Sequence, residues 1–339
     1  MTSQRRSPRS VNRGSPVGER VAMSASRSPG PLSRLLDASI LLSFDRTGYR
    51  RHAAGFDPTD LEVDLAGRVC LVTGANSGIG FETSLALAAR GGQVWMLCRN
   101  RERGLAAVRA VRARTGSRRV HLGVIDVSDT ASIRRFVRSL KDPVVDVIVH
   151  NAGVLPDERT ESADGHELTF ATHVLGPWLL TTQLLPRLRK SRDARVVFVS
   201  SGGMYTQALS LRDWEWRDRP YDGVVAYAQT KRMQVVLAEL LAAELEDSGI
   251  CVNAMHPGWA DTPAVRTSLP RFWNVMQRML RTTAEGADTV VWLAASPAAR
   301  GQSGRFWFDR QARSTHLLPW TRERRQQRQA LRRLCEQLT

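Results

Sequence analysis

The chain has 339 residues, of which 42% are hydrophobic and 24% are charged, a composition typical of one large globular domain with extensions. Its formal net charge of +16 lies mainly in the two ends, because residues 1–34 and 310–339 each carry an excess of about six positive charges. The centre is therefore nearly balanced. Aromatic residues are not interleaved with the terminal arginines, which argues against a nucleic-acid-binding protein.

No apolar run reaches the roughly 18 residues that span a bilayer. Residues 35–44 form a shorter apolar segment that contains Asp37. We interpret this segment as a helix docked on the protein itself, with peripheral membrane contact through residues 34–44 as the alternative. The four cysteines show neither metal-ligand spacing nor a disulfide framework, so we expect no metal site and a reducing, cytoplasmic location. Mitochondrial targeting by the arginine-rich N-terminus is the less favoured alternative.

Four segments follow from the pattern along the chain. Residues 1–33, rich in Ser, Arg, Pro and Gly, predict a disordered basic tail, although translation could also start at Met23. Residues 34–64 predict a short helical lead-in, and residues 65–318 predict a single domain without internal repeats. Residues 319–339 predict a basic amphipathic helix with an apolar stripe that includes Leu331 and Leu334.

Short runs of β-branched residues recur from Arg68 onwards, separated by amphipathic helical stretches. The runs are RVCLVTG, QVWMLCR, VHLGVID, VVDVIVHNAG, ARVVFVSS, GICVNAMHPG and GRFWFD. Continuous apolar strands that alternate with helices indicate a parallel sheet covered on both faces. The sequence therefore predicts a doubly wound α/β (Rossmann) fold with a seven-stranded parallel sheet.

A glycine-rich turn, in LVTGANSGIGFET, follows the first predicted strand and opens a helix. Gly74, Gly78 and Gly80 would let the backbone approach a pyrophosphate at the positive end of that helix. Tight turns also need glycine, but the position between a first strand and a helix makes dinucleotide binding the favoured interpretation.

The second predicted strand ends with Arg99 where a carboxylate usually accepts a hydrogen bond from the ribose of NAD. A guanidinium suits a 2′-phosphate, so we favour NADP(H) over NAD(H), the alternative being that Arg99 belongs to a solvated helix start. After the third strand, Asp126 and Val127 lie where an adenine would bind.

Tyr227 and Lys231 are four residues apart near the start of a predicted helix, and therefore share one of its faces. Lysine occurs in this chain only at Lys141, Lys190 and Lys231, with arginine supplying the other basic side chains. Such a pair occurs by chance in many proteins, so its meaning depends on the motifs around it.

Four motifs occur in order: the glycine turn, HNAG after the fourth strand, VSSGG after the fifth strand, and Y-x-x-x-K. Together they resemble the short-chain dehydrogenase/reductase family, over about residues 61–318. The resemblance implies an oxidoreductase that interconverts an alcohol and a carbonyl. In such an enzyme Tyr227 would be the acid/base, and Lys231 would lower the pKa of Tyr227 and bond the nicotinamide ribose. Ser201, which we favour over Ser200, would hold the substrate oxygen by a hydrogen bond.

The family pattern also implies the residues around the cofactor. They are Gly74, Asn76, Ser77, Gly78, Ile79, Gly80, Arg99, Asp126, Val127, Asn151, Ala152, Gly153, Tyr227, Lys231, Pro257, Gly258 and Thr262. His150 stands before this turn where asparagine is usual, and His256 is interpreted as a loop residue without a proton role.

His173 occupies the place of the family's fourth catalytic residue, an asparagine that steadies a water in the proton relay. Histidine both donates and accepts, so we retain His173 as a candidate catalytic residue. The departure also motivates an alternative function, an NADP(H)-binding sensor or scaffold with weak or lost catalysis.

Two inserts are expected to shape the substrate pocket. One, between Ser201 and Tyr227, contains Trp214, Trp216 and Tyr221; the other contains RFWNVMQRML, with apolar residues at helical spacing. The second insert is either a helix covering the core or a mobile apolar lid over a small lipophilic carbonyl or alcohol. The long helix after Tyr227 often builds dimer interfaces in similar enzymes, which suggests a homodimer by analogy.

Overall fold

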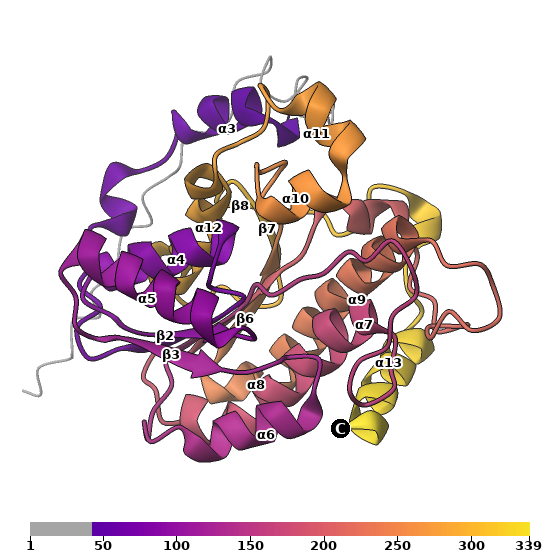
Figure 1. Cartoon of the computed structure of the whole chain (residues 1–339), viewed down its shortest axis with the longest axis horizontal. Coiled ribbons are helices and arrows are strands. Elements are labelled where there is room, and N and C mark those ends of the chain that lie inside the picture. Colours follow the sequence, from indigo (N-terminus) through magenta and orange to yellow (C-terminus); the bar gives the residue numbers. More distant parts are fainter. Residues whose placement is uncertain (1–42) are drawn as a thin grey trace, which may run out of the picture.

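A twisted β-sheet runs through the centre of residues 43–339, the part of the chain that this computed structural model describes (Figure 1). The strands are β1 (Val69–Thr73), β2 (Gln93–Cys98), β3 (Val120–Val124), β4 (Val147–His150), β5 (Arg195–Val199), β6 (Cys251–Met255), β7 (Phe306–Phe308) and β8 (Gln311–Arg313). They lie in the order β3-β2-β1-β4-β5-β6-β7-β8. The predicted doubly wound fold is confirmed, and the direction of winding changes between β1 and β4.

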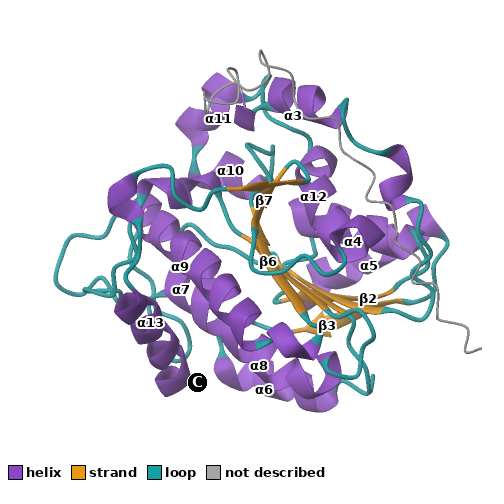
Figure 2. Ribbon diagram, turned by 180° about the vertical axis from the view of Figure 1, so that it is seen from behind, coloured by secondary structure: helices purple, strands orange, loops and turns teal. Residues whose placement is uncertain are grey.

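Helices cover both faces of the sheet, as Figure 2 shows. One face packs against α4 (Gly78–Ala89), α5 (Arg101–Thr115) and α12 (Thr283–Ala295), and the other packs against α6 (Thr130–Ser139), α8 (Gly176–Leu188) and α9 (Gly223–Glu244). Every residue of β1, β4 and β5 is buried. Strands that are apolar on both faces can only be stable between two such layers, which is why the sequence pattern predicted them well.

The remaining elements are short or lie at the ends of the described chain. They are α3 (Arg46–Ala53), α7 (Leu168–Phe170), a π-helix η2 (Ala171–Leu175), α10 (Pro263–Ser268), α11 (Pro270–Met276), α13 (Arg325–Leu338), and the 3₁₀ turns η1 (Pro58–Leu61), η3 (Gly202–Thr206), η4 (Glu246–Ser248), η5 (Pro297–Ala299) and η6 (Pro319–Thr321).

The sheet has an eighth strand that the sequence did not predict. β8 pairs antiparallel with β7 through a two-residue turn, in which Asp309 and Arg310 have φ angles of 49° and 57°. Such hairpin turns usually carry Asn or Gly, so this Asp-Arg pair gave no turn signal. Ionic contacts hold the turn instead: Arg281 pairs with Asp309 and Asp288 pairs with Arg310.

Both ends of the described chain pack onto the central domain. The tail predicted for residues 1–33, and the segment 34–44 except for its last two residues, lie outside the described residues. Phe44 is 9% exposed, and at the other end Leu331 and Cys335 of α13 are fully buried against the domain (Figure 1). No helix within residues 43–339 has the length and apolarity of a membrane span.

A buried arginine of α9 attaches the C-terminal segment to the central domain. The guanidinium of Arg232 lies 2.6 Å from the carboxylate of Glu323 and is 1% exposed, while Glu323 is 3% exposed. Arg232 also donates to the backbone oxygen of Thr321 and contacts the sulfur of Met204 in η3. A guanidinium in such a position needs its carboxylate, since an unpaired charge in the interior is strongly destabilising.

We therefore expect Glu323→Gln to lower the free energy of unfolding by about 3 kcal/mol, because Arg232 would remain buried without its counter-charge. Glu336→Gln is the matched control: it breaks the exposed Arg332–Glu336 pair of α13 and should cost less than about 0.5 kcal/mol. Urea denaturation followed by circular dichroism measures both. Equal losses in the two variants would show that the buried pair does not stabilise this attachment.

Candidate active site

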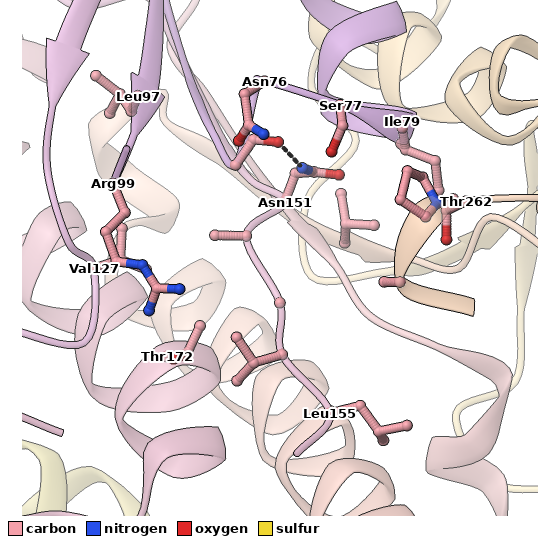
Figure 3. Close-up of a pocket in the computed structure, with 18 of the residues that line it drawn as sticks. Asn76, Ser77, Ile79, Leu97, Arg99, Val127, Asn151, Leu155, Thr172 and Thr262 are labelled. Carbon is pink, nitrogen blue, oxygen red and sulfur yellow. Dashed lines mark hydrogen bonds between the residues drawn. The ribbon is translucent and has the colours of Figure 1, made fainter. Parts of the chain in front are cut away.

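A cleft opens at the carboxyl ends of the strands, beside the point between β1 and β4 where the winding changes. Its lining residues include Gly74, Asn76, Ser77, Gly78, Ile79, Arg99, Asp126, Val127, Asn151, Ala152, Gly153, Tyr227, Lys231, Pro257 and Thr262, all of them predicted site residues. Four other predicted residues, Gly80, His173, Ser201 and Gly258, lie behind this lining or beside it. In Figure 3, Ile79 and Thr262 lie together at one side of the cleft, and Arg99 extends into it from the other.

The glycine turn has a backbone shape that other residues would not adopt. Gly74 and Gly78 have φ angles of +64° and +59°. At Gly80, a Cβ atom would lie 2.4 Å from the Asn151 side-chain nitrogen and 2.6 Å from the Gly74 oxygen. The N-cap residue Ser77 makes no side-chain hydrogen bond to the first turn of α4. Gly78 and Ile79 of that turn line the cleft, and their N–H groups have no side-chain cap, an arrangement that fits a pyrophosphate.

The far end of the cleft is where an adenosine would lie, and it carries one guanidinium and one carboxylate. The Arg99 side chain is 67% exposed and lies 3.8 Å from the Asp126 carboxylate. Asp126 accepts hydrogen bonds from the backbone and the hydroxyl of Ser128, which fixes its position after β3. Among residues 43–339, Arg99 has no buried partner, so its charge is available to an anion in the cleft.

Asn151 is held by the protein itself. Its side-chain nitrogen donates to the backbone oxygens of Thr73 and Gly74, at 2.9 and 3.2 Å (Figure 3). The Thr73 hydroxyl accepts from the backbone N–H groups of Asn151 and Ala152. These bonds join the turn after β4 to the turn after β1, so the two walls of the cleft are fixed relative to each other. The preceding His150 is a core residue, bonded to Thr181 at 2.7 Å.

The two serines after β5 have different partners. The hydroxyl of Ser200 is buried and donates to the backbone oxygen of Lys231 at 2.8 Å. The hydroxyl of Ser201 instead bonds with the phenol of Tyr227 and accepts from the backbone N–H of Gly203. Burial raises the pKa of Tyr227 to about 12, against a smaller opposing effect of the Ser201 hydroxyl. Ser201, not Ser200, therefore shares a hydrogen bond with the phenol.

Lys231 lies beneath the phenol and is 2% exposed. Its ammonium donates to the Val199 backbone oxygen at 2.8 Å and to the Gln234 side chain at 3.1 Å, and it lies 5.3 Å from the centre of the Tyr227 ring. Burial lowers the pKa of Lys231 to about 7. The amine and the phenol are thus brought together by one turn of α9, as the four-residue spacing predicted.

His173 lies in the π-helical turn η2 and is fully buried, with its Nε2 3.2 Å from the position of a Cβ at Gly153, a residue that lines the cleft. Its Nδ1 bonds the Thr230 hydroxyl at 2.8 Å, and its Nε2 accepts from the Val154 backbone N–H at 3.0 Å. The Thr230 hydroxyl in turn donates to the Tyr227 backbone oxygen, so Nδ1 carries the proton. Burial, together with Lys231, holds the pKa of His173 well below its usual range. His173 is therefore neutral, and both of its nitrogens are occupied.

The segment after β6 forms the remaining wall. Pro257 and Thr262 line the cleft, and the Thr262 methyl group lies 3.5 Å from the position of a Cβ at Gly78. Gly258 has a φ of +72°. His256 is 2% exposed and stacks on Phe308 at 4.2 Å, so it belongs to the core and not to the loop surface. From Thr262 the chain leads into α10 and α11, where Met276 is buried and Val275 is 80% exposed.

Several residues of the site were not predicted. Leu155 and Thr172 line the cleft. Thr73 accepts a hydrogen bond from the backbone of Ala152, and Gln234 accepts one from Lys231. Gln234 could have been found, because it stands three residues after Lys231 on the same helix face. Thr73 gave no signal, since a threonine at the end of a buried strand is ordinary.

The insert before Tyr227 packs against the segment after β4. Glu215 accepts hydrogen bonds from His166 and from the backbone of Glu167, and the ring of Trp214 lies 4.3 Å from that of Phe170. Tyr221 donates to the buried carboxylate of Glu167. The insert is therefore held in a fixed position against the segment after β4.

Comparison with known proteins agrees with this geometry. A family model described as short chain dehydrogenase matches residues 68–271. Dehydrogenase/reductase SDR family member 12 of Homo sapiens is 44% identical over 279 residues, which cover 82% of this chain and 87% of that protein. Retinol dehydrogenase 12 of Bos taurus is 36% identical, covering 76% and 82% of the two chains. Stretches of this chain such as DRQARSTHL resemble the first of these relatives.

The fold is shared with solved structures. A short-chain dehydrogenase of Escherichia coli, crystallised in complex with NADPH, superposes with a TM-score of 0.61 at 25% identity, covering 75% of this chain and all of that one. The predicted resemblance is thus confirmed by sequence, by fold and by the order of the motifs around the cleft. This chain belongs to the short-chain dehydrogenase family and is an oxidoreductase that acts on a CH–OH group.

Proposed function

We propose that the protein is an NADP(H)-dependent oxidoreductase that interconverts an alcohol and a carbonyl on a lipophilic small molecule, with Tyr227 as the acid/base. The observation that carries the proposal is the contact of the Tyr227 phenol with the Ser201 hydroxyl, directly above the buried Lys231. Ser201 comes from the turn after β5 and the other two side chains come from α9, and the three meet at one edge of the sheet. The organisation that we propose has one catalytic domain, residues 65–318, with a lead-in before it and a helix after it.

The residues that would hold the dinucleotide form a continuous surface. The first turn of α4 and the glycine turn suit the pyrophosphate, and Asp126 with Val127 suits the adenine. Pro257 and Thr262 would face the nicotinamide end. The exposed guanidinium of Arg99 supports a 2′-phosphate, and therefore NADP(H). The NADPH complex of the Escherichia coli relative is consistent with this preference.

The bound nicotinamide would supply or accept the hydride, and the chain's own residues would handle the proton. When a carbonyl is reduced, the Tyr227 phenol donates to its oxygen; when an alcohol is oxidised, the phenolate accepts the proton. Ser201 holds the same oxygen by a hydrogen bond. The Lys231 ammonium, 5.3 Å from the ring, favours the phenolate by its charge. His173 acts by position, joining the Val154 loop to α9.

A lipophilic substrate suits the surroundings of the phenol. Val154 and Leu155 line the same cleft as Tyr227, and α11, which follows Thr262 in the chain, carries Phe272, Val275 and Met276. One relative is named a retinol dehydrogenase, and retinol is a lipophilic alcohol. Incubation with NADPH and a panel of decanal, benzaldehyde, retinaldehyde and steroid ketones, followed by absorbance at 340 nm, tests the proposal. NADPH binding without turnover on any panel member would favour the sensor alternative.

Substitutions at the phenol and its neighbouring serines test their roles. Tyr227→Phe should reduce kcat by about 100-fold or more and leave NADPH binding intact, because only the transferable proton is lost. Ser201→Ala should cost more activity than Ser200→Ala, since the Ser200 hydroxyl is engaged with the backbone of Lys231. Ser248→Ala, in η4 beyond the end of α9, is the control. The reverse order of the two serine variants would contradict our assignment of Ser201.

Reversal of one charge tests the cofactor preference. Arg99→Asp should weaken NADPH binding by at least about tenfold more than NADH binding, because it replaces the guanidinium beside the 2′-phosphate with a carboxylate. Arg103→Asp makes the same charge change on the exposed surface of α5, outside the cleft, and should affect both cofactors alike. Dissociation constants of NADPH and NADH, measured by fluorescence titration, test this preference. Equal weakening of both cofactors by Arg99→Asp would refute the NADP(H) assignment.

The pH dependence of alcohol oxidation follows from the two pKa values of the pair, about 12 for Tyr227 and about 7 for Lys231. The active form, a phenolate beside an ammonium, holds one proton fewer than the form that dominates below pH 7. The rate should therefore rise about tenfold per pH unit up to about 7. Above that it should level off, because the neutral-lysine form that then dominates holds the same number of protons.

Measurement of kcat from pH 5 to 9 with NADP⁺ and a lipophilic alcohol tests this profile. Lys231→Arg, whose charge does not titrate in this range, should convert the plateau into a continued rise in whatever rate remains. A wild-type rate that is constant between pH 5 and 7 would contradict the assigned pair.

A further inference from the structure

The backbone oxygen of Phe44 lies at the base of the segment that carries α10 and α11. It accepts hydrogen bonds from the Trp259 backbone N–H at 2.8 Å and from the Arg281 guanidinium at 2.9 Å. A Cβ at Gly258 would lie 2.7 Å from it. This one carbonyl group therefore bonds the chain on both sides of a later excursion, at Trp259 before it and at Arg281 after it.

We call that excursion, residues 262–280, the lid. The chain leaves the domain at Ala260 and returns at Arg281, and these two residues form an isolated parallel bridge. The backbone of Arg46 donates to Met279 within the lid, and the Arg46 side chain lies 3.2 Å from the Glu285 carboxylate just after it. In Figure 1, α3 and α11 lie next to each other at the same side of the molecule.

The side chain of Phe44 reaches the other side of the active site. Its ring lies edge-on to His256, with centroids 4.3 Å apart, and contacts Trp259 and Phe308 in the same manner. A Cβ at Gly202 would lie only 2.5 Å from the ring, so the ring packs directly on this glycine. Gly202 follows Ser201, and the ring therefore limits where that serine can lie.

A buried charge network secures these contacts. The Arg281 guanidinium pairs with the Asp309 carboxylate at 2.6 Å, and the same carboxylate bonds His52 of α3 at 2.6 Å. All three side chains are at most 2% exposed. Arg281 also donates to the backbone oxygen of Ser43. The network joins the segment Ser43–Ala53, the base of the lid and the β7–β8 turn, and breaking it would leave a charge unpaired in the interior.

We infer that residues 43–53 are a working part of the active site, with Phe44 as a positioning residue. Its carbonyl fixes the lid over the substrate side of the cleft, and its ring fixes the turn that carries Ser201. These residues precede the part of the chain that matches the family model, residues 68–271. The inference rests on the proposed function in one respect, the role of Ser201 and the lid in turnover.

The phosphate loop is not touched by Phe44, and the loss of its ring should therefore separate turnover from cofactor binding. Phe44→Ala should reduce kcat about tenfold or more, because Ser201 and the lid lose a fixed position. The dissociation constant for NADPH should stay within about threefold of the wild-type value. Arg109→Ala, on the exposed side of α5 and outside both residues 43–53 and the cleft, is the control and should change neither quantity.

Hydrogen exchange followed by mass spectrometry gives a readout that needs no substrate. In NADPH-bound Phe44→Ala, peptides from residues 262–280 should exchange about tenfold faster than in the wild type, while peptides from β4 and β5 should not change. Phe44→Leu, which keeps more of the apolar volume, repeats the comparison if Phe44→Ala does not fold. Unchanged exchange in the lid overturns the inference, whether or not the protein turns over any substrate.

The contact between Phe44 and Gly202 provides a second test, in which the effects of changing each residue alone and both together are compared. Gly202→Ala alone should reduce kcat about tenfold with retinaldehyde or whichever panel aldehyde reacts fastest, because the added methyl group displaces the Phe44 ring. In the Phe44→Ala background the same change should have no further effect, since the methyl group then has room. Additive losses would overturn the positioning role of the ring. If no panel member reacts, the proposed function has failed and the exchange experiment still decides this inference.

Discussion

Burial of one ammonium group beside one phenol is the constraint on which the arrangement of the site depends. Because the ammonium of Lys231 is buried away from solvent, it must be hydrogen-bonded within the protein. Its partners are the backbone oxygen of Val199 at the end of β5 and the side chain of Gln234. Because Lys231 and Tyr227 share one face of α9, these bonds also set the rotation of the helix against the sheet. That rotation brings the phenol to Ser201 and leaves Ser200 to bond the helix backbone.

The remainder of the cleft follows from the parallel sheet. Each strand ends at the same edge, so turns that are distant in the sequence meet there. Their meeting is close: Gly80 packs on the Asn151 side chain, and Thr73 bonds the backbone of the turn after β4. The neutral His173 continues this bracing from the Val154 loop to Thr230. Preorganised positions of this kind allow hydrogen bonds to act on a reacting oxygen without rearrangement.

Two buried guanidiniums extend the same principle to the ends of the chain. Arg232 follows Lys231 on α9 and pairs with Glu323, which attaches the C-terminal segment. Arg281 pairs with Asp309 and attaches the N-terminal segment at the base of the lid. Arginine suits both places because its planar group serves several oxygens at once while remaining charged. Buried arginine side chains therefore contribute to the attachment of the C-terminal segment to α9 and of residues 43–53 to the base of the lid.

The sequence by itself determined the features that depend on local pattern. Apolar β-branched runs predicted seven strands, and the glycine turn, Arg99 and the Tyr227–Lys231 spacing predicted the cleft, because each signal lies within a few neighbouring residues.

The tertiary structure alone decided features that depend on residues far apart in the chain. Among them are the antiparallel β8, which forms after a turn held by Arg281 and Asp288, the different partners of Ser200 and Ser201, and the neutral state of His173. The place of Phe44 beneath the lid is the clearest case: its partners, Gly202, Trp259 and Arg281, lie more than 150 residues later, and no local pattern records which distant atoms will bury an apolar ring or accept a charge.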